Sequence, residues 1–154
     1  MKRSTCLNWL IVFGLFVPLL GCSFRVTAPL PSDTTATVNG FSTDASGHLV
    51  ITVSFSDPVN ESTVIPQRTL ILKFAKNANE NATLTWLNSK TLKIVTVDKR
   101  DDLMVFAPDG SFSLTLIGTD VGNGAVKSTS GAILDGNYDG KPGGDYVKGF
   151  TIIG

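Results

Sequence analysis

Residues 49–56 read LVITVSFS, in which the large apolar residues Leu49, Ile51, Val53 and Phe55 alternate with Val50 and three polar residues. Successive side chains of an extended chain point to opposite faces, so Leu49, Ile51, Val53 and Phe55 would all lie on one side. Alternation with a period of two is typical of a half-buried β-strand. This stretch is the clearest structural signal in the sequence, and it indicates a β-sheet that buries one face.

Weaker versions of the same pattern recur along the chain. We predict further strands at residues 70–74, 82–86, 91–97 and 111–116, a last strand whose phase is set by Phe150 and Ile152, and a weak strand at 36–41. The inward face of 91–97 is ambiguous. Trp86 falls on the inward phase of its run, so we interpret it as a core residue rather than a ligand platform.

Turn-forming residues separate these runs. Pro58 ends the first strand, Asn88-Ser89 links two others, and Pro108-Asp109-Gly110 precedes another. Asn60 is predicted to cap one short helical turn. No amphipathic helix of useful length is evident, and Asp101-Asp102 is interpreted as a solvated turn. The sequence therefore predicts an all-β fold, an immunoglobulin-like (Ig-like) sandwich of about seven short antiparallel strands, with a small barrel as the alternative.

The composition narrows the function classes. The 154 residues include 13 Lys+Arg and 13 Asp+Glu, so bulk charge does not attract nucleic acid, and we expect no nucleic-acid partner. Hydrophobic residues make up 42% and charged residues 17%, which is not the composition of a disordered chain. One His and two Cys leave little material for zinc or thiol chemistry.

The N-terminus has the features of an export signal. A basic start at residues 1–3 precedes an uncharged apolar run at 9–20, shorter than the roughly 20 residues of a membrane-spanning helix. The run ends in LLGC at residues 19–22, which resembles the lipobox of bacterial lipoprotein precursors. The resemblance implies cleavage after Gly21, a thioether-linked diacylglycerol on Cys22 and acylation of the new amino terminus, for example with palmitate. The alternatives are an ordinary secretory signal or an uncleaved anchor.

This interpretation divides the chain into three parts. Residues 1–21 are the predicted signal peptide, 22–35 the lipidated Cys and a Pro/Ser/Thr tether, and 36–154 the Ig-like domain. The predicted location is the bacterial cell envelope, with a membrane anchor through Cys22. Ser23 replaces the Asp that tends to retain lipoproteins at the inner membrane, which favours the outer membrane if the source is Gram-negative. No thiol would remain after processing.

Three segments of the domain resemble one known family. FSDPVNESTV at residues 55–64, WLNSKTLKI at 86–94 and SFSLTL at 111–116 are similar, in order and spacing, to bacterial Ig-like domains of the kind grouped with the surface-layer protein SbsA. The resemblance covers about residues 36–153. It implies an Ig-like sandwich of exported proteins that serves as a non-catalytic spacer or binding module.

A long Gly- and Asp-rich connection precedes the last strand. Asp135, Asn137 and Asp139 match the start of a D-x-N-x-D-G calcium loop, but Tyr146 stands where the loop needs Glu. Calcium prefers 6–8 oxygen ligands at about 2.3–2.6 Å, which alternating Asp and Asn can provide. A looser calcium site would add Asp145.

The same residues also support a structural interpretation. Asp-Gly, Asn and Pro-Gly-Gly are turn formers, and a hairpin scaffold needs no metal. Asp120 and Asn123 would be further oxygen donors if a calcium site existed. Tyr138 and Tyr146 are predicted to pack the loop onto the sandwich.

Signatures of catalysis are missing from the sequence. It contains no G-x-S-x-G elbow and no S-x-x-K motif. We therefore predict a non-enzymatic lipoprotein with no required cofactor that displays a structural or interaction module to a cell-envelope protein or glycan. The alternatives are a calcium-dependent adhesion or ligand-binding domain that uses the loop 135–145, and a glycan-active or glycan-binding protein.

Overall fold

The computed structural model describes residues 33–74, 78–120 and 124–152. The predicted signal peptide, Gly21, Cys22 and residues 22–32 of the tether lie outside the described residues, as does Asn123. The first strand begins at Ala36, where the domain was predicted to begin.

The alternating stretch at residues 49–56 forms the centre of the first sheet. Its strands are β1 (Ala36–Thr43), β2 (His48–Phe55), β5 (Ala82–Asn88) and β6 (Thr91–Lys99), in the order β1-β2-β6-β5, all antiparallel. Leu49, Ile51, Val53 and Phe55 are buried, as the period of two predicts. Leu92 and Ile94 are also buried, which resolves the inward face of β6.

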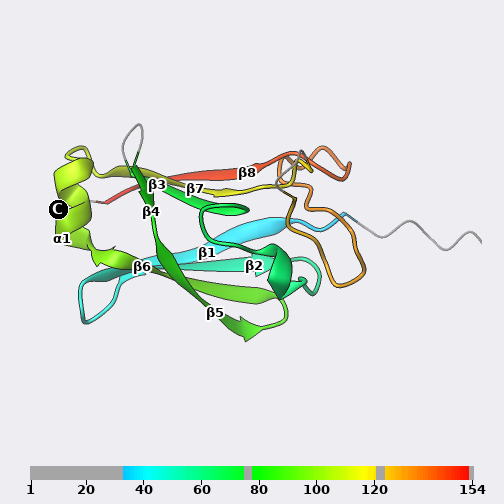
Figure 1. The fold of residues 1–154 in the computed structure, drawn as a ribbon, viewed down its shortest axis with the longest axis horizontal. Helices are drawn as coiled ribbons and strands as arrows, with labels where there is room; N and C mark the ends of the chain where they lie inside the picture. Colours follow the sequence, from blue (N-terminus) through cyan, green and yellow to red (C-terminus); the bar gives the residue numbers. More distant parts are fainter. Residues whose placement is uncertain (1–32, 75–77, 121–123, 153–154) are drawn as a thin grey trace, which may run out of the picture.

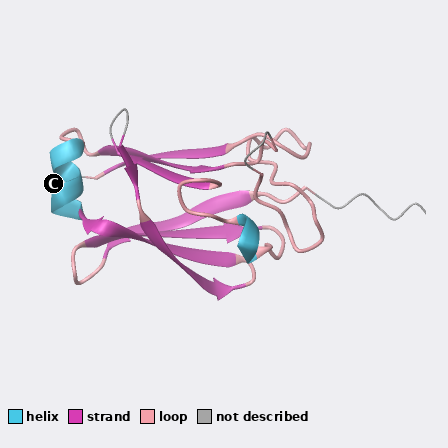
Figure 2. Ribbon diagram, in the orientation of Figure 1, coloured by secondary structure: helices cyan, strands magenta, loops and turns pink. Residues whose placement is uncertain are grey.

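The second sheet packs on the buried face of the first. It contains β3 (Leu70–Phe74), β4 (Ala78–Glu80), β7 (Ser111–Leu116) and β8 (Tyr146–Thr151), in the order β4-β3-β7-β8, again antiparallel. The two layers lie one above the other in Figure 1, with their long axes roughly aligned. Figure 2 shows that strands dominate the structure.

The strand order is that of an immunoglobulin-like sandwich. If the eight strands are lettered A, B, C, C′, D, E, F and G along the chain, the sheets read A-B-E-D and C′-C-F-G. The predicted all-β sandwich is therefore confirmed. The described residues form eight strands rather than about seven, because β4 has only three residues, too few for a sequence pattern to reveal.

Four aromatic rings fill the core between the sheets. Phe112 stacks on Phe74 and on Phe150, with ring centroids 4.8 and 4.7 Å apart, and Phe41 lies 5.2 Å from Phe112. Such contacts add to the stabilisation from apolar burial alone. The rings come from β1, β3, β7 and β8, so they join the two sheets.

The interpretation of Asp101-Asp102 as a solvated turn is wrong. The segment forms α1 (Arg100–Phe106), with both carboxylates exposed in its first turn. Leu103 is 2% exposed and anchors the helix on the core. A seven-residue helix is unstable alone, so its tertiary packing, which the local sequence does not reveal, decides its formation.

The other predicted turns are confirmed. Asn60 caps the short 3₁₀ helix η1 (Glu61–Thr63) by accepting a hydrogen bond from the Ser62 N–H. Asn88 accepts one from the Lys90 N–H in the β5–β6 hairpin, and Asp109 accepts one from the Ser111 N–H before β7.

The sandwich has two different ends. At one end, the chain leading into β1 lies against the Gly-rich connection, because Thr34 pairs with Leu134. At the other end, α1 crosses from the first sheet to the second (left in Figure 1), close to where β8 ends.

Candidate functional site

Asp135 is the most buried of the predicted calcium ligands, at 2% exposed. One carboxylate oxygen accepts a hydrogen bond from the Asp139 N–H at 3.2 Å, and the other accepts one from the Gly140 N–H at 3.0 Å. The Asp135 N–H donates to the Thr34 carbonyl at 2.7 Å. Buried charge is costly unless it is hydrogen-bonded, and these amides supply the partners. Asp135 therefore holds the loop 135–140 against the chain that leads into β1.

Asp145 serves a different segment of the chain. Its Oδ1 accepts hydrogen bonds from the Gly118 and Thr119 N–H groups at 3.0 and 3.1 Å. Gly118 lies so close to the loop that an added Cβ would be 2.0 Å from the Gly144 carbonyl oxygen. The carboxylate thus ties the chain that follows β7 to the chain that precedes β8.

Asn137 and Asp139 are exposed and bonded to each other. The Asn137 Nδ2 donates to Asp139 Oδ2 at 3.2 Å, while Asp139 Oδ1 accepts from the Lys141 N–H at 2.9 Å. Asp120, the additional donor considered above, forms a 3.2 Å ion pair with Lys127. Each of these carboxylates therefore already has a protein partner.

The two tyrosines pack the loop onto the sandwich, as predicted. Tyr146 is buried, and its hydroxyl oxygen accepts a hydrogen bond from the Val38 N–H at 3.2 Å. Tyr138 donates its hydroxyl hydrogen to the Ala36 carbonyl. The two rings meet edge to face at 6.2 Å. Both contacts fall on β1, so the loop is fixed to the first strand of the domain.

This arrangement supports a structural role for the acidic loop. The loop carboxylates mainly accept hydrogen bonds from backbone amides, which is the behaviour of turn-forming Asp residues. Across residues 33–74, 78–120 and 124–152, no three His, Cys, Asp or Glu side chains are grouped so that they could hold a metal ion. Calcium binding by Asp135, Asn137, Asp139 and Asp145 stays a prediction.

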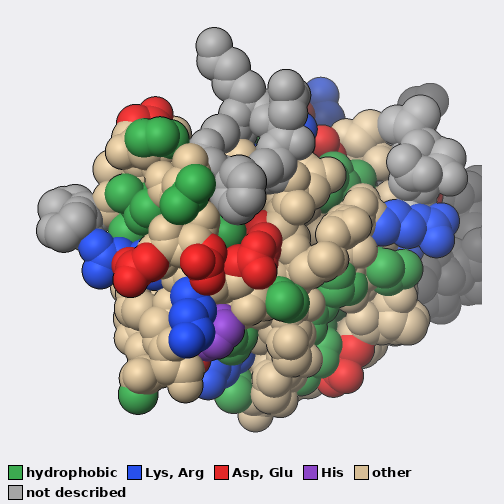
Figure 3. Space-filling view, turned by 60° about the vertical axis from the view of Figure 1, so that its left-hand side comes forward, with side chains coloured by type: hydrophobic (Ala, Val, Ile, Leu, Met, Phe, Trp, Pro, Cys, Tyr) green, Lys and Arg blue, Asp and Glu red, His purple; other side chains and the backbone are tan. Residues whose placement is uncertain are grey.

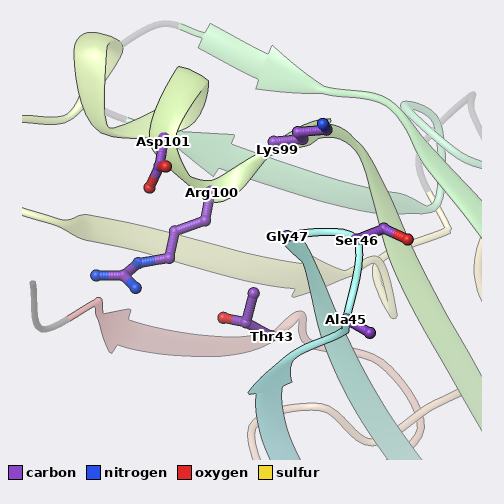
Figure 4. Close-up of a pocket in the computed structure, with 7 residues that line it drawn as sticks. All are labelled: Thr43, Ala45, Ser46, Gly47, Lys99, Arg100 and Asp101. Atoms are coloured by element: carbon purple, nitrogen blue, oxygen red, sulfur yellow. The ribbon is translucent and has the colours of Figure 1, made fainter.

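A polar cleft of about 350 Å³ opens at the opposite end of the sandwich. Its walls are the β1–β2 turn and the junction of β6 with α1, and its lining residues are Thr43, Ala45, Ser46, Gly47, Lys99, Arg100 and Asp101 (Figure 4). The Arg100 N–H donates to the Gly47 carbonyl at 2.8 Å and joins the two walls. The side chains of Lys99 and Arg100 leave the junction in opposite directions in Figure 4, so the cleft does not gather positive charge.

Sequence reasoning missed this cleft because its two walls are more than 50 residues apart in the chain. Asp44, in the β1–β2 turn, accepts hydrogen bonds from the His48 and Ser46 N–H groups at 2.9 Å, and the bond from His48 holds the pKa of the carboxyl below its usual range. Acidic and basic side chains lie side by side over this end of the molecule (Figure 3). Mixed charge of this kind favours solubility over binding of one charged ligand.

Glu80, near the same end, has a raised pKa. Partial burial raises the pKa of Glu80, and the neighbouring negative charge of Asp98 adds to the effect. Its Oε1 accepts hydrogen bonds from the Val97 and Asp98 N–H groups at 3.1 and 2.9 Å, which act in the opposite direction. Glu80 thus joins the end of β4 to β6 at some electrostatic cost.

Trp86 lies at the border of the core. Its ring is 5.9 Å from the ring of Phe55, and the side chain is half-buried against the core. The prediction of an inward-facing Trp is confirmed, but the residue keeps an exposed part because β5 is the last strand of its sheet.

No protein-family model matches the chain, and no curated protein matches it either. Within the described part of the chain, neither helix has the length and apolar character needed to cross a membrane.

Proposed function

We propose that this chain is an exported bacterial lipoprotein that is anchored through Cys22 and presents an Ig-like domain as a non-catalytic interaction or structural module. The observation that supports this proposal most directly is the order of features along the chain. A basic start is followed by an apolar run, by LLGC at residues 19–22, and then by a sandwich that begins at Ala36. Two or three acyl chains give stable anchoring where one does not, because each buried methylene contributes about 0.8 kcal/mol.

The polar groups of the domain support a module that does not catalyse a reaction. Its carboxylates at the acidic-loop end accept hydrogen bonds from backbone amides, and its cleft at the α1 end combines acidic, basic and hydroxyl groups without a paired nucleophile and base. The resemblance to SbsA-type Ig-like domains agrees with this proposal. The partner that fits it is a protein or glycan of the cell envelope.

Metabolic labelling tests the anchor, and the chain provides its own matched control. We expect the full-length protein, expressed in a bacterial host with labelled palmitate, to incorporate the label. Cys22→Ala should abolish labelling, whereas Cys6→Ala should leave it intact, because Cys6 lies in the predicted signal peptide. Equal labelling of the two variants, or no labelling of the unaltered chain, would reject the proposed lipoprotein.

Calcium binding by the acidic loop is the second candidate, favoured by the proximity of Asp135, Asn137 and Asp139 in one turn. Thermal unfolding of the segment 23–154 in EDTA and in millimolar Ca²⁺ tests it. A ligand at 100 times its dissociation constant stabilises by about 2.7 kcal/mol, a shift of several degrees. If the carboxylates only organise turns, the two curves coincide. A calcium-specific rise that Asp139→Ala removes would instead establish the metal site.

A further inference from the structure

The outer edge of β5 carries unused backbone hydrogen-bonding groups. β5 is the last strand of its sheet, with only β6 beside it, and it lies at the lower border of the molecule in Figure 1. The Val97 N–H donates to the Asn81 carbonyl at 3.0 Å. Hydrogen-bonded pairs alternate along an antiparallel ladder, so Thr83 and Thr85 bond to β6, while the backbone groups of Leu84 and Trp86 point to the free edge.

The side chains along this edge do not prevent another strand from pairing with it. Residues 81–89 read NATLTWLNS and contain no charge and no Pro. Natural sheet edges are usually protected by charged residues, Pro, bulges or very short strands. Leu84 and Trp86 are half-buried on the inner side of the edge, and Leu87 is 57% exposed. An added strand would therefore gain apolar contacts as well as main-chain hydrogen bonds.

The other three edges each carry such protection. β1 has a bulge between Val38 and Gly40, and its edge is capped by the hydroxyls of Tyr138 and Tyr146. β4 has three residues and ends at Glu80, and β8 contains Lys148 and Gly149. β5 also has a bulge, between Trp86 and Asn88, but it lies at the C-terminal end of the strand. Among the described strands at sheet edges, only β5 offers an uninterrupted, uncharged stretch of five residues, 82–86.

The sequence of β5 is complementary to itself. In an antiparallel pair centred on Thr85, Leu84 of each copy faces Trp86 of the other on the inner side. Thr85 faces its own equivalent on the outer side, and Thr83 lies opposite Leu87, at the bulge that ends the regular part of β5. This register directs the free N–H and C=O groups of Leu84 and Trp86 at one another. It also produces aromatic–aliphatic cross-strand pairs without opposing charges, and pairs of this kind stabilise antiparallel sheets.

We propose that β5 is a self-association edge, at which a second copy of this chain adds its own β5 antiparallel to form an eight-stranded sheet across a two-fold axis. In the dimer the β5 edge of each copy is paired with the β5 edge of the other. Because the remaining edges are protected, no further copy can add a strand, and assembly stops at the dimer. A single strand pair buries much less than the roughly 1,200 Å² of a standard interface, so the dimer is weak in solution. Its formation does not depend on the lipid anchor, although anchoring would raise the local concentration.

Disulfide trapping tests both the pairing and its register. The segment 23–154 contains every described strand and no Cys, so an introduced Cys is its only thiol. Thr85 would form a non-hydrogen-bonded pair with its own equivalent, with Cα atoms about 4.5 Å apart, inside the range for a disulfide. Thr85→Cys should therefore give a disulfide-linked dimer under mild oxidation. The matched Thr83→Cys should give at least about tenfold less, because its two copies would be about 13 Å apart.

Two results would overturn the proposal. Equal cross-linking of Thr83→Cys and Thr85→Cys would mean random collision. Efficient cross-linking between the two variants in a mixture, without Thr85→Cys self-linking, would place the two-fold axis at Leu84 and overturn the register. Thermal unfolding of each variant verifies that it keeps the fold.

A charge at the same position tests the interface without covalent trapping. Thr85→Lys places two like charges opposite each other in the dimer and should weaken association by about tenfold or more in sedimentation velocity. Thr52→Lys is the matched control, because Thr52 and Thr85 flank Lys93 from opposite sides on the same sheet. Both variants repel Lys93, but only Thr85 lies at the edge. Association that is unchanged by Thr85→Lys, or weakened equally by both, would refute the edge pairing.

Discussion

At the scale of single residues, Gly136 shows how closely the acidic loop is packed. An added Cβ would lie 2.1 Å from the Tyr146 nitrogen, and the Gly136 N–H donates to the Gly143 and Gly144 carbonyls. Backbone cannot move away as a flexible side chain can. We expect Gly136→Ala to lower the free energy of unfolding by about 3 kcal/mol in urea denaturation. Gly149→Ala, on the open face of β8, is the control and should change it by less than about 1 kcal/mol.

Glu80 gives a residue-scale prediction that depends on pH. Its pKa is raised in the folded protein, mainly by burial and then by Asp98, so the folded state binds the proton more tightly than the unfolded chain. The stability that comes with a protonated Glu80 is present below the unfolded pKa and is lost as pH rises through the folded pKa. Glu80→Gln keeps an oxygen that can accept from the Val97 and Asp98 N–H groups and removes the charge.

The Glu80→Gln variant should therefore melt about 1–3 °C higher than the unaltered protein at pH 7, because the site is only partly buried. The difference should vanish at pH 4, where Glu80 is largely protonated in both states. Melting curves at the two pH values measure this. A gain of equal size at both values would show that charge is not its cause.

At the scale of the elements, α1 is stabilised mainly by one side chain. Leu103 is 2% exposed, whereas Val105 is 74% exposed on the same short helix. Leu103→Ala should reduce the free energy of unfolding by about 2–4 kcal/mol, because it leaves a cavity where α1 covers the end of the core. Val105→Ala should have almost no effect in the same denaturation experiment. Ala has the highest helix propensity, so neither change weakens α1 through propensity. A Leu103→Ala loss no larger than that of Val105→Ala would contradict the packing role of Leu103.

The elements differ in how far the sequence predicts them. Strands such as β2 and β7 are predictable because each buries one face, and Leu49 or Leu114 then fixes the phase. β4 and α1 are not, because three and seven residues contain too little periodicity, and their partners in the fold decide their conformation.

The acidic loop shows the same limit at the residues predicted to bind calcium. Spacing identifies Asp135 and Asp145 as a pair of interest, but the amides that Asp145 bonds belong to Gly118 and Thr119, more than 20 residues away. A metal-like spacing and a turn scaffold use the same residue types. The backbone partners of the Asp145 carboxylate become evident only from the position of these amides in space.

At the scale of the whole molecule, the position of the N-terminal strand defines an orientation for the proposed lipoprotein. Thr34 lies against Leu134, so the chain from Cys22 reaches the domain at the acidic-loop end, while α1 lies at the opposite end. The cleft at the α1 end would therefore be directed away from the membrane.

Fluorescence quenching by spin-labelled lipids measures this orientation. We expect a fluorophore on Lys141→Cys, in the acidic loop, to be quenched more strongly than one on Val105→Cys, on α1, when the lipidated chain is reconstituted into vesicles. Both positions are exposed, so labelling leaves the core intact. The same pair in a Cys22→Ala background is the control and should show no quenching at either site. Stronger quenching at residue 105 would mean that the domain folds back onto the bilayer, with its α1 end as the membrane-facing surface.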